Sequence, residues 1–212
     1  IPLGFDLERF NTNKESKRIE FRKKWNLKEN EIAIGIIGRL VPIKNHMFFI
    51  DAIQKVLKKS EFPIRAFIVG DGEEKQNIIN YIKSKNLDFS LDYTPATFNL
   101  TSWVKEIDRV NSGMDIICLT SLNEGTPVSL IEAQASGKPI VSTKTGGIKN
   151  IVLENKTALL SEKNDLHNFS KNLLSLVNDS EKRILFSKYG LEKSKDFQYD
   201  KLIDSMKKLY KI

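Results

Sequence analysis

Short, almost wholly apolar runs of five to seven residues recur along this chain, separated by longer amphipathic stretches. The runs are EIAIGII (31–37), RAFIVG (65–70), MDIICLT (114–120), KPIVS (138–142) and TALLS (157–161). Such runs are typical of strands buried on both faces, and strands that alternate with helices form parallel sheets. We therefore expect one α/β domain: a Rossmann-like, doubly wound parallel sheet with helices on both faces.

The stretches between these runs have helical spacing. Within 46–59, apolar Met47, Ile50, Ile53 and Leu57 recur three to four residues apart. Further helices are expected over 14–25, 73–85, 99–111, 128–136 (ended by Gly137) and, as a run of helices, 165–212. A short strand is expected at 89–93.

The composition is that of a globular domain with a basic surface. The chain has 34 Lys and Arg against 27 Asp and Glu, so its net charge is +7. This excess favours anionic partners such as nucleotides, phosphates, nucleic acid or an acidic membrane face, although a solvated lysine-rich surface explains most of it. The single cysteine, Cys118, lies in an apolar run and is expected to be buried. No continuous apolar run reaches the ~18 residues that a membrane-spanning helix needs.

In open α/β sheets, ligands bind beyond the carboxyl ends of the strands, so the loops at those ends carry most of the functional information. The loop after 31–37 contains Gly38, Arg39 and Lys44. Gly38 allows a sharp turn and close approach of a ligand, and the two cations suit phosphate oxygens. The alternative is that both cations are surface side chains paired with acids. The loop after 65–70 reads Gly-Asp-Gly-Glu (70–73); it lacks the spacing of a dinucleotide fingerprint and is expected to be a turn.

The third loop leads from 114–120 into the helix 128–136 and contains Glu124 and Glu132, with seven residues between them. Free backbone N–H groups over 125–130 make an anion site at the helix start. Two carboxylates beside an anion site must contact a part of the ligand other than its anionic group. Vicinal sugar hydroxyls suit them, because these hydroxyls donate hydrogen bonds in pairs. A nucleotide-sugar has phosphates for the amides and cations, and hydroxyls for the acids. The alternative is one capping acid and one salt bridge.

Four stretches together resemble a known family: IPLGFD, GRLVPIKNH, IVGDGEE and DIICLTSLNEGTPVSLIEAQASGKPIVSTKTGG. They are similar to the nucleotide-sugar-binding half of group 1 (family four) retaining glycosyltransferases, which have the two-domain GT-B fold. The resemblance covers essentially the whole chain, and the pair of glutamates in this context is its most specific part. It implies transfer of a sugar from a nucleoside diphosphate sugar to an acceptor, such as a glycan or lipid, with retained anomeric configuration.

The resemblance also implies roles for single residues. Arg39 and Lys44 correspond to the basic pair on the donor diphosphate. Glu132 corresponds to the acid on the ribose hydroxyls, and Glu124 to the acid beside the transferred sugar. Amides of Val128, Ser129 and Leu130 would bind the phosphates, and the loop at Thr94 and Pro95 would bind the base. The other donor-binding positions implied are Gly38, Gly70, Gly125, Thr126 and Pro127, which has no N–H to give.

No metal and no cofactor are implied, with the nucleotide-sugar entering as substrate. The two histidines, His46 and His167, are isolated in the sequence and are expected to be structural or exposed.

Residues 1–212 correspond to the donor-binding domain of the family, with 1–13 as the segment that crosses between domains and 197–212 as a helix that packs back across the other half. The chain lacks an initiator methionine and the family's N-terminal acceptor domain. We therefore expect a fragment that binds donor weakly and transfers nothing. Two stretches depart from the family: Pro2-Leu3-Gly4, where asparagine is usual in the middle, and 91–110, which is longer than the common form.

Two other functions stay open at this stage. A sugar-nucleotide epimerase with a related fold would also bind a nucleotide-sugar, but would yield a C2 epimer without an acceptor. A non-catalytic nucleotide-binding module would bind any polyanion in a strongly salt-dependent way. Aromatic and basic residues are not interleaved as in single-strand binders, so no nucleic-acid partner is expected.

The expected partners are a nucleoside diphosphate sugar and the missing N-terminal domain. The expected location is cytoplasmic, and a peripheral position on the inner membrane face, with a membrane-associated acceptor, is left open.

Overall fold

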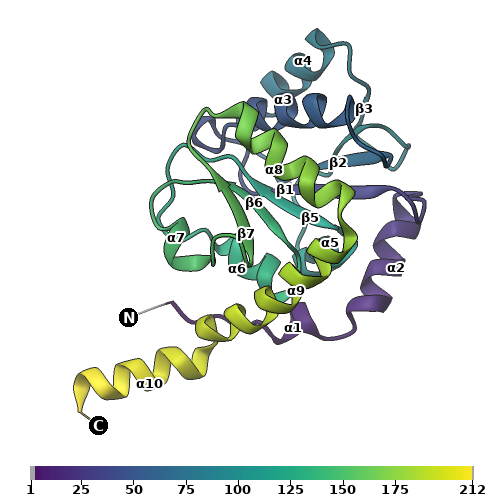
Figure 1. Cartoon of the computed structure of the whole chain (residues 1–212). Helices are drawn as coiled ribbons and strands as arrows, with labels where there is room; N and C mark the ends of the chain where they lie inside the picture. The colour runs from purple at the N-terminus through teal and green to yellow at the C-terminus, as the bar shows by residue number, and fades with distance from the viewer. Residues whose placement is uncertain (1–2, 212) are drawn as a thin grey trace.

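The computed structural model describes residues 3–211, which form a sheet of seven strands between two layers of helices (Figure 1). The strands are β1 Ile32–Ile37, β2 Ile64–Val69, β3 Phe89–Ser90, β4 Phe98–Leu100, β5 Ile116–Leu119, β6 Ile140–Thr143 and β7 Ala158–Ser161. They lie in the order β3-β4-β2-β1-β5-β6-β7, and each neighbouring pair is parallel. The chain builds outward from β1 on one side and from β5 on the other, so the sheet is doubly wound, as predicted.

Helices cover both faces of this sheet. On one face lie α3 His46–Leu57, α4 Lys75–Ser84 and α8 Leu166–Asn178; on the other lie α1 Glu8–Asn11, α2 Lys14–Lys24, α5 Ile107–Gly113, α6 Val128–Ala135 and α7 Ile148–Ile151. Alternate side chains of β1 serve the two layers. Ile34 and Ile36 join the core cluster under α3, whereas Ala33 and Ile37 join the cluster under α6. Burial on both faces explains why the strands are continuous apolar runs.

The described chain ends in α9 Ser180–Ser194, the short 3-10 turn η2 Lys195–Phe197 and α10 Tyr199–Tyr210; a second 3-10 turn, η1 Pro42–Lys44, follows β1. Helix α10 projects from the body of the domain (Figure 1) and has no buried residue. Its apolar residues Ile203, Met206 and Leu209 are exposed. Residues 1, 2 and 212 lie outside the described residues, and with them the Pro2 part of the predicted crossing segment.

The strand runs and the main helices are confirmed within a few residues, but the helix predicted over 99–111 is wrong in its first half. There the chain forms β4, which pairs in parallel with β2, and α5 begins only at Ile107. The Asn99 side chain is buried and donates to the carbonyls of Ala66 and Ala96, which lets a polar residue sit inside the sheet. Ser102 then has a left-handed φ of 57°, which turns the chain out of the strand. The strand predicted at 89–93 is only Phe89–Ser90, and α1 and α7 were not predicted.

A network of ion pairs ties α2 to the amino ends of two central strands. The Asp115 carboxylate lies 2.8 Å from Nη2 of Arg18 and 3.2 Å from Nη1 of Arg22. Its Oδ2 also accepts a hydrogen bond of 2.8 Å from the backbone N–H of Ala33 in β1. Since Asp115 directly precedes β5, one largely buried carboxylate joins a helix and two strands.

Replacing Asp115 with alanine is expected to lower the free energy of unfolding by about 2–4 kcal/mol, because two arginines lose their charged partner and a strand amide loses its acceptor. A fall of several degrees in the melting temperature should follow. Glu162→Ala is the matched control, since the Glu162 carboxylate is exposed and makes no ion pair within the described residues. Equal melting temperatures for the two variants would contradict this role of Asp115.

Candidate functional site

A cavity of about 610 Å³ opens at the carboxyl ends of β1 and β2, beside the start of α6. This is where a doubly wound sheet binds ligands, because the strand order reverses between β1 and β5. The cavity is lined by Arg9, Ile37, Gly38, Arg39, Lys44, Val69, Gly70, Trp103, Val104, Lys105, Ile107, Glu124, Thr126, Pro127, Val128, Ser129 and Glu132.

Most of the site residues predicted from the sequence meet in this one cavity. They are Gly38, Arg39, Lys44, Gly70, Glu124, Thr126, Pro127, Val128, Ser129 and Glu132. Gly125 lies in the same loop but does not line the cavity. The structure contradicts the expected amide of Leu130: that N–H donates to the carbonyl of Pro127 at 3.0 Å, so it is not free for a phosphate.

The first residues of α6 present free backbone donors to the cavity. Pro127 is the N-cap of the helix, and the N–H groups of Val128 and Ser129 donate to no protein acceptor in the part of the chain that is described. Both residues line the cavity. An anion placed there would accept from these donors and lie at the positive end of the helix dipole.

Of the four cationic residues that line the cavity, the two predicted from the sequence are in different states. Lys44 is paired: its Nζ lies 2.6 Å from Oε1 of Glu124. The same Oε1 accepts a hydrogen bond of 2.6 Å from the Ser121 hydroxyl. Arg39 is exposed, and no carboxylate pairs with it among residues 3–211. The alternative noted from the sequence, cations paired with acids, therefore applies to Lys44 and not to Arg39.

Close backbone contacts at glycines fix the loops that carry these side chains. A methyl group added to Gly70 would lie 2.0 Å from the carbonyl oxygen of Gly38, which no side chain can tolerate. At Gly146, where φ is 48°, an added methyl would lie 1.8 Å from the carbonyl oxygen of Glu124. The neighbouring Gly147 N–H donates to that same oxygen at 3.0 Å. The loops after β1, β2, β5 and β6 are thus packed backbone against backbone.

Glu132 lies on α6, one turn in from the helix start, and faces the cavity together with Arg9. Burial raises the pKa of Glu132 to about 7; nearby Arg9 opposes the shift, and Asp108 adds to it. Its carboxyl makes no hydrogen bond or ion pair with another described residue. A ligand that donates hydrogen bonds to this carboxyl would supply the partners that the described chain does not.

The expected base-binding residues Thr94 and Pro95 do not line the cavity. The Asp92 side chain folds their loop locally by accepting from the N–H of Thr94 at 2.8 Å and from the Ser90 hydroxyl at 2.8 Å. Tyr93 in this loop packs on Trp25, the residue that follows α2, with ring centroids 4.7 Å apart. The loop therefore belongs to a separate, smaller pocket.

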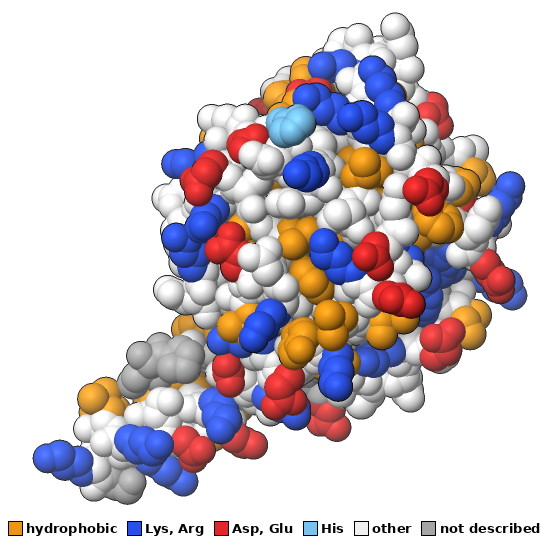
Figure 2. Space-filling model, in the orientation of Figure 1, with side chains coloured by type: hydrophobic (Ala, Val, Ile, Leu, Met, Phe, Trp, Pro, Cys, Tyr) orange, Lys and Arg blue, Asp and Glu red, His pale blue; other side chains and the backbone are white. Residues whose placement is uncertain are grey.

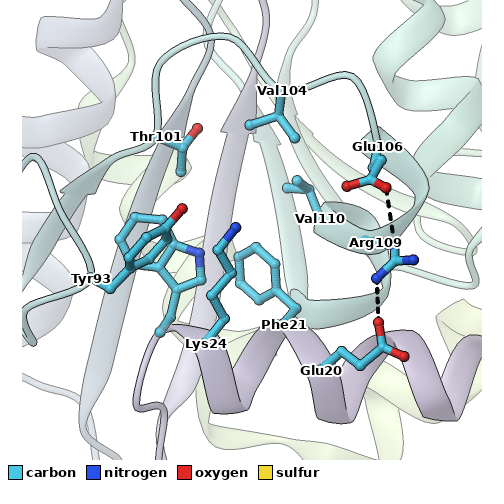
Figure 3. Close-up of a pocket in the computed structure, with 10 residues that line it drawn as sticks. Glu20, Phe21, Lys24, Tyr93, Thr101, Val104, Glu106, Arg109 and Val110 are labelled. Carbon is cyan, nitrogen blue, oxygen red and sulfur yellow. Dashed lines mark hydrogen bonds and ion pairs between the residues drawn. The ribbon is translucent and has the colours of Figure 1, made fainter.

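Figure 3 shows that smaller pocket, of about 120 Å³. Aromatic side chains line one side of it, and on the other Arg109 lies between Glu20 and Glu106 (Figure 3). Val104 is shared with the larger cavity, so the two pockets are neighbours.

Besides the apolar residues Ile37, Val69 and Ile107, sequence reasoning missed four lining side chains of the large cavity: Arg9, Trp103, Val104 and Lys105. Arg9 lies on the short α1, inside the segment expected only to cross between domains. The other three lie in the loop between β4 and α5, over which a helix was expected. Trp103 is 69% exposed, and the signal for it in the sequence was a tryptophan in a stretch without helical apolar periodicity.

Four further predictions concern the rest of the chain. Cys118 is buried, as expected, and burial raises the pKa of its thiol. His46 is buried, with its pKa lowered to about 4 by burial and, to a lesser degree, by Lys44, whereas His167 is exposed.

Among residues 3–211, no cluster of three or more His, Cys, Asp or Glu is arranged to hold a metal ion. No described helix combines the length and apolar character needed to cross a membrane.

Taken together, the cavity offers two guanidiniums without a carboxylate partner among the described residues (Arg9 and Arg39), two ammonium groups (Lys44 and Lys105), two free amides at a helix start and two carboxylates. Phosphate oxygens suit the first three, and hydroxyl groups suit the carboxylates. An exposed aromatic ring at the rim adds a surface on which a flat ring can stack.

Solved structures with the same fold include nucleotide complexes. The Anabaena protein HepE in complex with UDP has a TM-score of 0.84 at 20% identity, over 98% of this chain and 56% of that one. The C-terminal domain of a glycosyl transferase group 1 family protein, LpcC from Francisella tularensis, has a TM-score of 0.76 at 22% identity, over 92% of this chain and 100% of that domain. These similarities confirm the GT-B type of Rossmann-like domain.

Curated relatives agree in class. The UDP-Gal:alpha-D-GlcNAc-diphosphoundecaprenol alpha-1,3-galactosyltransferase of Escherichia coli is 30% identical over 99% of this chain and 53% of its own length. The D-inositol 3-phosphate glycosyltransferase of Corynebacterium urealyticum is 24% identical over 100% of this chain and 50% of its own length. The chain thus spans about half the length of these relatives. With a match to the family model of glycosyl transferases group 1 over residues 17–193, this chain belongs to that family.

Proposed function

We propose that this chain binds a nucleoside diphosphate sugar and forms the donor half of a retaining glycosyltransferase. The observation that supports this most is the convergence, in one cavity, of groups that suit phosphates with groups that suit hydroxyls. Such an enzyme transfers the sugar from the nucleotide to an acceptor hydroxyl with the anomeric configuration retained.

The diphosphate lies between Arg39, Lys44 and the amides of Val128 and Ser129 in this proposal. Negative charge grows on the leaving nucleoside diphosphate as the bond to the sugar breaks. Preorganised cations and amides stabilise that charge more strongly than the ground state, and this is the main electrostatic contribution to catalysis. No metal and no cofactor take part in the proposed reaction.

Glu132 accepts hydrogen bonds from the two ribose hydroxyls, and Glu124 lies beside the transferred sugar. The base lies toward Gly70, Val104 and Trp103, which line the cavity near the end of β2. These residues take the role that the family resemblance implied for Thr94 and Pro95. Uracil is the first base to test, since solved structures of the same fold hold UDP and one relative is named for UDP-Gal.

The acceptor side belongs to a second half that these 212 residues do not contain, as the half-length match to the relatives suggests. The exposed apolar face of α10 then packs on that half. The 212 residues alone bind donor weakly and transfer nothing, and detectable transfer by them would overturn this part of the proposal. Because one relative is named for a diphosphoundecaprenol-linked substrate, we place the acceptor on a lipid and the enzyme at the cytoplasmic face of a membrane.

The two rival functions make different predictions. An epimerase would convert UDP-N-acetylglucosamine to its C2 epimer with no acceptor present. A polyanion-binding module would need a broad basic surface, but basic and acidic side chains are interspersed on the face that Figure 2 shows. The cavity suits the nucleotide-sugar that an epimerase would also bind, so it is the match to the group 1 family model that favours the transferase over the epimerase.

The nucleotide class should be visible in thermal melting with UDP-, GDP- and ADP-sugars. Ligand at ~100 times its Kd adds about 2.7 kcal/mol to the free energy of unfolding, a rise of several degrees. We expect one nucleotide to stabilise the wild type, and neither Arg39→Ala nor Glu132→Ala to respond at the same concentration. Lys163→Ala, which changes an exposed lysine outside the cavity, should respond like wild type. Equal stabilisation of all four proteins would place the ligand elsewhere.

Donor affinity should rise with pH through about 7, the pKa of Glu132. Below this pH the carboxyl is protonated and neutral; above it the carboxylate accepts the ribose hydroxyls more strongly. A nucleotide-sugar, whose diphosphate does not titrate near neutrality, should bind about tenfold more tightly at pH 8 than at pH 6 by calorimetry. The slope should vanish in Glu132→Gln.

Glu132→Gln also separates the titration of Glu132 from that of Lys138, a second group whose pKa is near neutrality. Burial lowers the pKa of Lys138 to about 7 as well, but Lys138 donates to the carbonyl of Ser112 and does not line the cavity. A slope that persists in Glu132→Gln would therefore assign the pH dependence to Lys138 or another group, and not to Glu132.

A further inference from the structure

The pair formed by Lys44 and Glu124 occupies the centre of the proposed donor site before any ligand arrives. The ammonium lies 2.6 Å from the carboxylate, and the Lys44 and Glu124 side chains are 20% and 10% exposed. Two of the groups expected to contact different parts of the donor therefore neutralise each other in the empty site.

The backbone on both sides holds this pair in place. On the Lys44 side, the Thr120 hydroxyl donates to the Lys44 carbonyl at 2.8 Å. On the Glu124 side, the Glu124 carbonyl accepts from Gly147 at 3.0 Å, and the Ser121 hydroxyl holds the carboxylate itself at 2.6 Å. The Lys44 side chain can leave the pair without moving a loop, whereas the Glu124 side chain would also break its hydrogen bond with Ser121.

A diphosphate that takes Lys44 leaves the Glu124 carboxylate largely buried, with Ser121 as its remaining donor among the described residues. Separating a largely buried ion pair is costly unless the abandoned charge finds new hydrogen bonds. A sugar attached to the diphosphate can supply them, because its hydroxyls are donors. A free nucleoside diphosphate ends at a largely ionised phosphate and has no sugar hydroxyls beyond it.

The charge of the ligand works in the same direction. The terminal phosphate of a free nucleoside diphosphate has a second ionisable oxygen and, like a phosphate monoester, carries about −1.5 to −2 charge near neutrality, whereas esterification by the sugar removes that second ionisation. The extra charge would lie close to the Glu124 carboxylate and be repelled by it.

We infer that the Lys44–Glu124 pair makes this site discriminate between the intact nucleotide-sugar and the nucleoside diphosphate that the reaction leaves behind. The inference rests on the proposed donor-binding function and adds to it a specificity-determining role. Glu124 disfavours the product by holding Lys44 back from it, and the transferred sugar removes that penalty. Release of the product is favoured by the same interaction.

The test compares the affinities of UDP and UDP-galactose for wild type and Glu124→Gln by calorimetry; the GDP or ADP pair replaces them if melting selects that base. Glutamine keeps the shape and the acceptor for Ser121 but frees Lys44. We expect Glu124→Gln to bind the free diphosphate about tenfold more tightly than wild type does, and the nucleotide-sugar no more tightly. The preference for the sugar ester should therefore fall by about that factor.

Two further variants make the result specific. Glu154→Gln breaks a comparable pair, in which Lys144 Nζ lies 3.3 Å from Oε2 of Glu154, outside the cavity, and should leave both affinities unchanged. With Lys44 already changed to Gln, Glu124→Gln should strengthen the free diphosphate less than it does in wild type, because the pair is absent from both proteins.

If both ligands bind wild type and Glu124→Gln leaves the ratio of their affinities unchanged, the pair does not discriminate and the inference is overturned, while the proposed donor site stands. If no nucleotide or nucleotide-sugar of the three bases binds wild type, the proposed donor binding by this chain fails and the inference fails with it. Melting of each variant without ligand verifies that it is folded.

Discussion

The site in this domain depends on backbone packed directly against backbone at the carboxyl edge of the sheet. Gly70 lies against the carbonyl of Gly38, and Gly146 against the carbonyl of Glu124, at distances that exclude even a methyl group. These contacts join the loop after β1 to the loop after β2, and the loop after β5 to the loop after β6. The ion pair between Lys44 and Glu124, 2.6 Å apart, links the two pairs of loops into one framework. Loops of this kind are normally the mobile part of a fold, and here they present charged side chains from fixed positions.

On that framework, the charged and polar groups of the site are held in three different states. Arg39 and the free amides of α6 are available to an anion, Lys44 is held by Glu124, and Glu132 lies in a place where burial raises its pKa to about 7. The empty site is therefore incompletely satisfied at several atoms. A ligand with phosphates at one end and hydroxyls at two places satisfies all of them, and this is the physical basis for proposing a nucleotide-sugar.

The doubly wound sheet and much of the cavity lining could be predicted from the sequence, because both leave a local pattern of residues. Strands buried on both faces need continuous apolar runs, and the loop from Glu124 to Glu132 is local in the sequence, so its geometry follows from the helix start. Each error involves at least one contact between residues that lie far apart in the sequence. Asn99 is tolerated in β4 because its amide bonds to Ala66 and Ala96. Thr94 and Pro95 are turned away by Asp92 and by the packing of Tyr93 on Trp25. Arg9 reaches the cavity only through the tertiary position of α1, and no local pattern marks it.

The central claim is that one cavity binds both the diphosphate and the hydroxyl groups of a nucleotide-sugar. A crystal structure of the chain with UDP-galactose, or with the nucleotide-sugar that melting selects, tests this claim most directly. The account expects the diphosphate between Arg39, Lys44 and the amides of Val128 and Ser129, with the ribose hydroxyls on Glu132 and the sugar beside Glu124. A ligand seated instead in the aromatic pocket at Tyr93 and Arg109 (Figure 3), with Lys44 still paired to Glu124, would contradict it.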